Sequence, residues 1–89
     1  MNKKYLSDTS LGNRYMIKKI NVDGSIKRRL LDIGMIEGTE VENVLISPFG
    51  DPMAFLIRGA VIALRNEVTS KIVVEALAWK RNGYLKRLL

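Results

Sequence analysis

The segment that most constrains the fold is 26–38, a short helical pattern followed at once by its stop signal and a turn. Ile26, Leu30 and Ile33 recur at intervals of four and three residues, which places them on one helical face. Gly34 follows at the position of a left-handed residue that ends a helix, and Met35 is placed to add the apolar contact that accompanies such an ending. A helix of about two turns is not stable alone, so it must pack on a sheet formed by the rest of the chain.

Alternating apolar residues and turn residues predict five short strands around this helix. The expected strands are 15–22, 39–47, 53–58, 61–65 and 71–77, the first with a bulge, and 66–70 is long enough for one helical turn. Gly38 suits the positive-φ position of a type II turn, and Gly59-Ala60 predicts a tight hairpin. Two prolines bracket the segment 48–52, which predicts a loop that carries Phe49 and Asp51.

These elements predict a mainly β fold, because a sheet this small gains most by removing its open edges. The expected architecture is a small SH3-like five-stranded barrel with one short α-helix between its first two strands, and an OB-type barrel is the alternative. The predicted domain is 1–77. Residues 78–89 form a basic C-terminal tail, for which a partial helix is expected.

The net charge of +6 is carried by the ends of the chain. Residues 15–77 contain eight Lys or Arg and eight Asp or Glu, whereas 78–89 contain four bases and no acid. A folded nucleic-acid reader concentrates its positive charge on the binding face, so no specific nucleic-acid partner is expected. The basic tail is instead a candidate for contact with an anionic membrane surface.

The residue types argue against catalysis and against a resident cofactor. The sequence has no cysteine and no histidine, so serine has no imidazole to activate it. No glycine-rich run resembles a phosphate-binding loop. Asp51, Glu67 and Glu75 are expected to be solvated carboxylates and not a metal site. Binding of a transition metal is left open, although no set of residues that would hold it can be named. The sequence predicts a non-catalytic binding module.

Targeting signals are not apparent in this sequence. The first residues lack the apolar core of a signal peptide, and the longest apolar run is far shorter than the roughly 20 residues that cross a bilayer. We therefore expect the protein in the cytoplasm, with the inner face of the membrane as a further place for it.

Several motifs in order give the chain a resemblance to a known family. They are Leu6 with Gly12, the run 29–34 followed by Gly38, the loop 48–52, Arg58-Gly59 with 62–65, and 72–74. With these motifs the chain resembles the ferrous iron transport protein A family of small SH3-like proteins. The resemblance covers nearly all of residues 6–77. It departs from the family pattern at Leu11 and Glu37, where similar proteins often have proline.

The resemblance implies an accessory role in ferrous iron uptake. Similar proteins are thought to bind the cytoplasmic part of a membrane iron permease, either its GTP-binding domain or its membrane portion. The alternative is a metal-dependent regulatory module, because similar SH3-like domains form the C-terminal part of iron-dependent repressors.

Two groups of residues are candidates for the partner surface and the turns. The expected partner-binding residues are Arg28, Arg29, Asp32 and Met35 around the helix and Phe49 and Asp51 in the loop. The expected structural turn residues are Gly34, Gly38 and Gly59. Arg28 and Asp32 stand four residues apart, so a solvated surface ion pair is favoured over a partner contact for these two.

Overall fold

The computed structural model of the 89-residue chain describes residues 3–77. The elements in order are β1 (Lys4–Tyr5), a 3-10 turn η1 (Leu6–Asp8), β2 (Arg14–Ile20), α1 (Gly24–Asp32), β3 (Glu40–Ile46), β4 (Met53–Ile57), β5 (Ala60–Leu64), α2 (Asn66–Thr69) and β6 (Ile72–Ala76). The predicted tail and its partial helix at 78–89 lie outside the described residues.

All six strands form one antiparallel sheet in the order β1-β6-β2-β3-β4-β5. The mainly β class and the helix between the first two long strands are confirmed, and the strand count is one higher than predicted. The additional strand, β1, pairs Lys4 with Val74 and Tyr5 with Val73. Two residues are too few to produce a periodic pattern, so β1 has no signature in the sequence.

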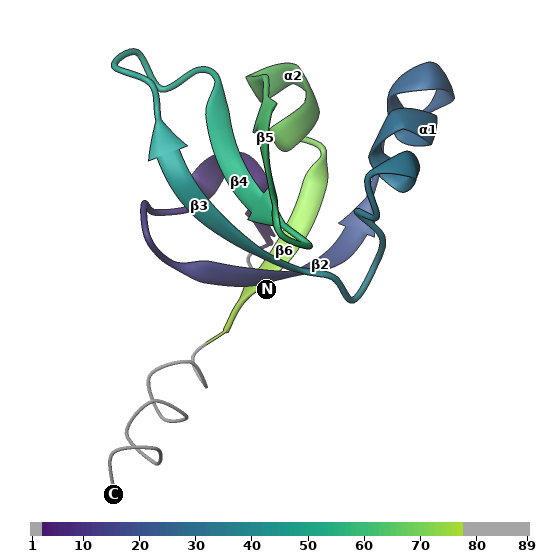
Figure 1. The fold of residues 1–89 in the computed structure, drawn as a ribbon, viewed down its shortest axis with the longest axis horizontal. Coiled ribbons are helices and arrows are strands. Elements are labelled where there is room, and N and C mark those ends of the chain that lie inside the picture. Colours follow the sequence, from purple (N-terminus) through teal and green to yellow (C-terminus); the bar gives the residue numbers. More distant parts are fainter. Residues whose placement is uncertain (1–2, 78–89) are drawn as a thin grey trace, which may run out of the picture.

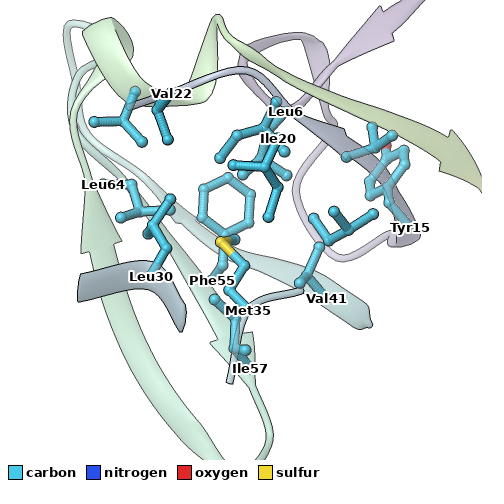
Figure 2. Packing of buried hydrophobic residues seen from close by; sticks show 14 residues of the cluster. Leu6, Tyr15, Ile20, Val22, Leu30, Met35, Val41, Phe55, Ile57 and Leu64 are labelled. Carbon is cyan, nitrogen blue, oxygen red and sulfur yellow. The ribbon is translucent and has the colours of Figure 1, made fainter. Parts of the chain in front are cut away.

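The sheet bends around a core formed by apolar side chains from nearly every element (Figure 1). Figure 2 shows side chains from η1, β2, α1 and β4 converging on the Phe55 ring, with Met35 beside it. The fully buried apolar side chains are Leu6, Ile17, Met35, Val41, Phe55, Ile57 and Ile72. Leu30 is the buried residue of α1, and Ile26 and Ile33 pack partly against the same cluster, as their shared helical face predicts.

The hairpin between β4 and β5 differs by one residue from the prediction. Ile57 pairs with Ala60, so the turn residues are Arg58 and Gly59 and not Gly59-Ala60. Both turn residues have positive φ, +49° for Arg58 and +85° for Gly59. A two-residue hairpin loop favours this conformation because its twist matches that of the strands. An arginine is an unusual residue for it, which is why the sequence pattern placed the turn one position later.

Two irregularities interrupt the strand pairing. The bulge predicted in the first long strand is confirmed, since the register of β2 against β6 shifts between Ile17 and Lys19. A second shift, between Asn43 and Leu45 of β3 against β4, was not predicted. The pairing of β4 with β5 has no such shift, so β5 is a regular strand along its whole length.

Candidate partner-binding surface

The C-terminal end of α1 is closed by a paired hydrogen-bond motif. The Gly34 N–H donates to the Leu31 carbonyl at 2.9 Å, and the Met35 N–H donates to the Leu30 carbonyl at 2.9 Å. This is the Schellman arrangement, and Gly34 supplies its left-handed residue with φ +86°. Leu30 and Met35 are both buried, so they provide the apolar contact that the motif favours.

Met35 lies in the core and not on the surface that we predicted for a partner. Its side chain is 0% exposed and belongs to the cluster around Phe55. The apolar contact that closes the helix turns this side chain inward, so a partner cannot reach it in this conformation. The prediction of Met35 as a contact residue is corrected accordingly.

Gly34 is also the place where the β4–β5 turn meets the end of α1. The Arg58 Nε donates to the Gly34 carbonyl at 2.9 Å. A Cβ atom built on Gly34 would lie 2.6 Å from the Arg58 Cδ, closer than real side chains approach. The Gly34 carbonyl accepts a second hydrogen bond, at 3.2 Å, from the Thr39 hydroxyl. Gly34 therefore joins α1, the turn before β3 and the β4–β5 hairpin.

The turn after α1 is held to β2. The Thr39 N–H donates to the Ile36 carbonyl at 3.0 Å, and Gly38 has φ +90°. The Gly38 N–H donates to the Ile17 carbonyl at 2.7 Å. These contacts position the chain between α1 and β3.

The outer face of α1 carries the other predicted residues of the helix. Arg28, Arg29 and Asp32 are exposed. Within residues 3–77 the ion pairs are Arg14–Glu40, Arg14–Glu42 and Lys18–Glu75, so the expected Arg28–Asp32 pair does not form. The guanidinium groups on this face are therefore not neutralised by a described carboxylate.

A groove of about 450 Å³ separates α1 from β5 and α2. Its apolar walls come from both sides, and two arginines and one glutamate line it as well. The lining residues include Ile26, Arg29, Ile33, Ile62, Arg65 and Glu67. Figure 1 shows α1 projecting to one side of β5 and α2. Of the predicted residues, Arg29 is the one that lines the groove.

The β3–β4 loop carries the most exposed large apolar side chain of the described residues. Phe49 is 97% exposed. Its loop is closed by two hydrogen bonds, from the Gly50 N–H to the Ser47 carbonyl at 2.7 Å and from the Ser47 N–H to the Pro52 carbonyl at 3.2 Å. The loop therefore presents the ring on a defined turn.

Asp51 fastens the same loop to the start of α2. Its Oδ1 accepts a hydrogen bond from the Asn66 N–H at 2.8 Å. This N–H is one of the donors that the first turn of a helix leaves unpaired, so the carboxylate caps α2 from a distant part of the chain. Asp51 is exposed, and the structure gives it this positioning contact beside Phe49.

The predicted residues form two separate groups. Figure 1 shows the β3–β4 loop and α1 on opposite sides of β5 and α2. The groove residues Ile62 and Arg65 and the turn residue Arg58 were not among the predicted site residues. Arg58-Gly59 before an apolar strand is a sequence signal for the hairpin, whereas nothing in the sequence indicates that the strand faces a groove.

The described part of the chain offers neither a cluster of metal ligands nor a membrane-spanning helix. Among residues 3–77, no three acidic side chains gather closely enough to hold a metal ion. No helix in this range has the length and hydrophobicity needed to cross a membrane.

Known structures confirm the SH3-like fold expected from the sequence. The FeoA protein from Chlorobium tepidum has a TM-score of 0.80 at 27% identity, covering 84% of this chain and 71% of that one. The Stenotrophomonas maltophilia FeoA, described as a procaryotic SH3 domain protein and solved with zinc, has a TM-score of 0.71 at 26% identity, covering 81% of this chain and 89% of that one. A manganese-dependent transcriptional repressor shares the fold, with a TM-score of 0.75 at 18% identity over 84% of this chain and 42% of the repressor chain.

A curated relative and a family model identify the family of this chain. An Fe(2+) transport protein A/Fe(2+) transporter FeoB fusion protein from Porphyromonas gingivalis is 29% identical over 73 residues, which are 82% of this chain. The chain spans only 9% of the length of that relative. The model of the FeoA domain matches residues 4–76, nearly all of the described structure. This chain therefore belongs to the FeoA domain family.

Proposed function

We propose that this protein is a non-catalytic accessory of ferrous iron uptake that binds the cytoplasmic part of a membrane iron permease. The observation that carries the proposal is the fusion relative, in which a transport protein A segment and an FeoB transporter are one polypeptide. Fusion keeps two domains at high effective concentration, which benefits domains that act together. We expect the same association with a permease for this protein.

The described surface is suited to such docking. Phe49 presents an aromatic ring on a closed loop, and aromatic residues are enriched among the anchors of protein interfaces. Neither Arg28 nor Arg29 on α1 forms an ion pair with a carboxylate among residues 3–77, so both are available for acidic groups of a partner. Asp51 positions the Phe49 loop, and Asp32 adds a carboxylate to the face of α1.

The basic segment 78–89 adds a second contribution to this proposal. Its four bases and absence of acids suit attraction to anionic lipid at the inner face of the membrane, about 1 kcal/mol for each base near the surface. This attraction would concentrate the protein where the permease lies. Because it is electrostatic, it would weaken as salt is raised.

The proposal is tested by titrating isotopically labelled protein with the isolated GTP-binding domain of the cognate iron permease. We expect amide shifts at α1, the groove and the Phe49 loop that persist at moderate salt, with and without a GTP analogue. Phe49→Ser should weaken the interaction, and Leu11→Ser is its matched control because Leu11 is also an exposed apolar residue, at 60%. Unchanged spectra at saturating domain would contradict binding to the soluble domain.

The alternative is a metal-dependent regulatory module, and it has less support. The repressor with the same fold is 18% identical, which supports a shared fold alone. A regulatory module would respond to ferrous or manganese ion without the permease domain. Amide shifts on adding either ion at micromolar concentration would favour this alternative.

A further inference from the structure

We propose that the partner of this protein adds an extended strand to the free edge of β5, beside α1, and that this strand turns both apolar and acidic residues toward the neighbouring groove. The inference deepens the proposed function and rests on it for the identity of the partner. It is carried by the backbone of β5, by the exposure of its side chains and by the charges of the neighbouring groove.

The first observation is that β5 has an unused edge. Among residues 3–77 it pairs with β4 alone, and it is the last strand of their sheet. Ile57 and Ala60 flank a two-residue turn, so they exchange both backbone hydrogen bonds, and Phe55 with Ile62 is the next such pair. The N–H and C=O groups of the alternate residues, Val61 and Ala63, therefore point away from β4. They are the groups that an added strand would use.

The second observation is that this edge lacks the devices that normally protect one. Natural edge strands carry charged residues, proline or bulges, or are very short. The five residues of β5 are all apolar, its register with β4 is regular, and Val61 is 63% exposed. The opposite edge, β1, has two residues, one of them the exposed Lys4. The sheet is protected at one edge and open at the other.

The third observation is the groove that runs along β5. Ile62 from the strand and Ile26 and Ile33 from α1 give it apolar walls. A strand paired with β5 would turn every second side chain toward these walls, which favours apolar residues at alternate positions. The free edge of β5 requires only that the bound segment has an extended backbone. The groove adds a requirement for particular side chains in that segment.

The fourth observation is the charge of the groove. Arg29 and Arg65 line it, with Glu67 as the opposing acid. Neither arginine forms an ion pair with a carboxylate among residues 3–77. Two guanidinium groups beside an apolar groove favour carboxylates in the bound segment and disfavour lysine or arginine there.

A second copy of this chain fits the edge less well. Two β5 strands paired antiparallel about Ile62 would place Val61 opposite Ala63 of the other copy, which matches the free backbone groups. The same register places Arg65 of one copy opposite Gly59 of the other, next to Arg58. Like charges brought together in this way oppose dimer formation. Self-association is therefore an outcome of the test and not the proposal.

The test uses a blocked peptide with threonine at every second position and with valine and glutamate sharing the positions between, so that both can face the groove, and it measures amide exchange in labelled full-length protein. We expect the exchange of the Val61 and Ala63 amides to slow by about tenfold or more at saturating peptide, because each gains a backbone partner. The matched peptide with lysine in place of glutamate should bind much more weakly. Unchanged exchange at both amides with the acidic peptide at saturation would overturn the proposal.

Two pairs of variants separate strand addition from side-chain contacts. Val61→Pro removes an edge N–H that β4 does not use, and Val61→Thr keeps that N–H while reducing the apolar surface. Val61→Pro should abolish the protection of Ala63, whereas Val61→Thr should preserve it. Arg29→Glu with Arg65→Glu leaves the backbone intact and should reverse the preference for the acidic peptide, and Lys19→Glu with Lys71→Glu is the control away from the groove. Equal binding by all variants would overturn the proposal.

The same variants distinguish this inference from the proposed function. The permease domain could bind the wild type and Val61→Pro equally, without slowing amide exchange at Val61 and Ala63. In that case the proposal of an added strand is wrong, and the proposed accessory function stands. If the acidic peptide protects these amides but the permease domain does not bind, the edge site stands and the soluble domain is the wrong partner. Protection that depends on protein concentration without any peptide would identify a second copy as the occupant and overturn the proposal.

Discussion

The end of α1 and the tip of the β3–β4 loop use their side chains in opposite ways. At the end of α1, Met35 is fully buried and the Gly34 carbonyl accepts hydrogen bonds from two distant residues. At the tip of the loop, Phe49 is 97% exposed while the backbone around it is closed by hydrogen bonds. Residues of both regions are predicted from the sequence as partner contacts. Burial assigns the first region to stability and leaves the second available for recognition.

This contrast predicts that substitutions at the end of α1 lower the free energy of unfolding, whereas substitutions at the loop tip change binding alone. Four substitutions test this contrast, each against a control variant or in a second background.

Met35→Ala should have the largest effect, a loss of about 3 kcal/mol in the free energy of unfolding, because it leaves a cavity beside Phe55. The control is Leu31→Ala, since Leu31 lies on the same helix end but is 47% exposed. Urea unfolding followed by circular dichroism measures both. A loss for Met35→Ala no larger than that for Leu31→Ala would contradict the burial of Met35.

Gly34→Ala should cost about 2 kcal/mol, from the positive φ of this residue and from displacement of the Arg58 side chain. In an Arg58→Ala background the same substitution should cost less, because the close contact is absent and the φ penalty alone is left. A double-mutant cycle in urea measures the difference. Equal losses of unfolding free energy in the two backgrounds would show that the Arg58 side chain does not restrict the side chain at position 34.

Asp51→Ala should cost about 1 kcal/mol, because the Asn66 N–H at the start of α2 loses its acceptor. Asp51→Asn is the matched control, since an amide oxygen can accept the same hydrogen bond. Thermal unfolding, together with the amide shift of Asn66, measures both variants. An unchanged Asn66 shift in Asp51→Ala would contradict the capping contact.

Phe49→Ser should change the free energy of unfolding by less than about 0.5 kcal/mol, because the exposed ring contributes little to the packing of the fold. If the ring is an interface anchor, the same change should raise the Kd for the permease domain by about 30-fold. Calorimetric titration against Leu11→Ser measures the second effect. A large loss of stability with unchanged affinity would reverse the contrast between the two regions.

Local features of the fold are predictable from the sequence. The α1 face, its glycine stop, the bulge in β2 and the five longer strands depend on residues that are near one another in the chain. Hydrophobic periodicity and turn chemistry act over this range, so they are visible without a structure. The two-residue β1 and the Arg58-Gly59 turn were missed because one is too short for a pattern and the other uses a residue uncommon at positive φ.

The candidate site could be predicted only in part. The loop position of Phe49 follows from the two prolines that bracket it, and the place of Arg29 on a short helix follows from the pattern around it. The exposure of the Phe49 ring is a finding of the structure. The burial of Met35 and the contact of Gly34 with Arg58, 24 residues apart, depend on how separate elements pack. The sequence by itself determined the elements and their ends, because these depend on interactions between neighbours in the chain. Only the tertiary structure decided that β5 is an edge strand beside an arginine-lined groove, because edges and grooves arise when distant segments meet.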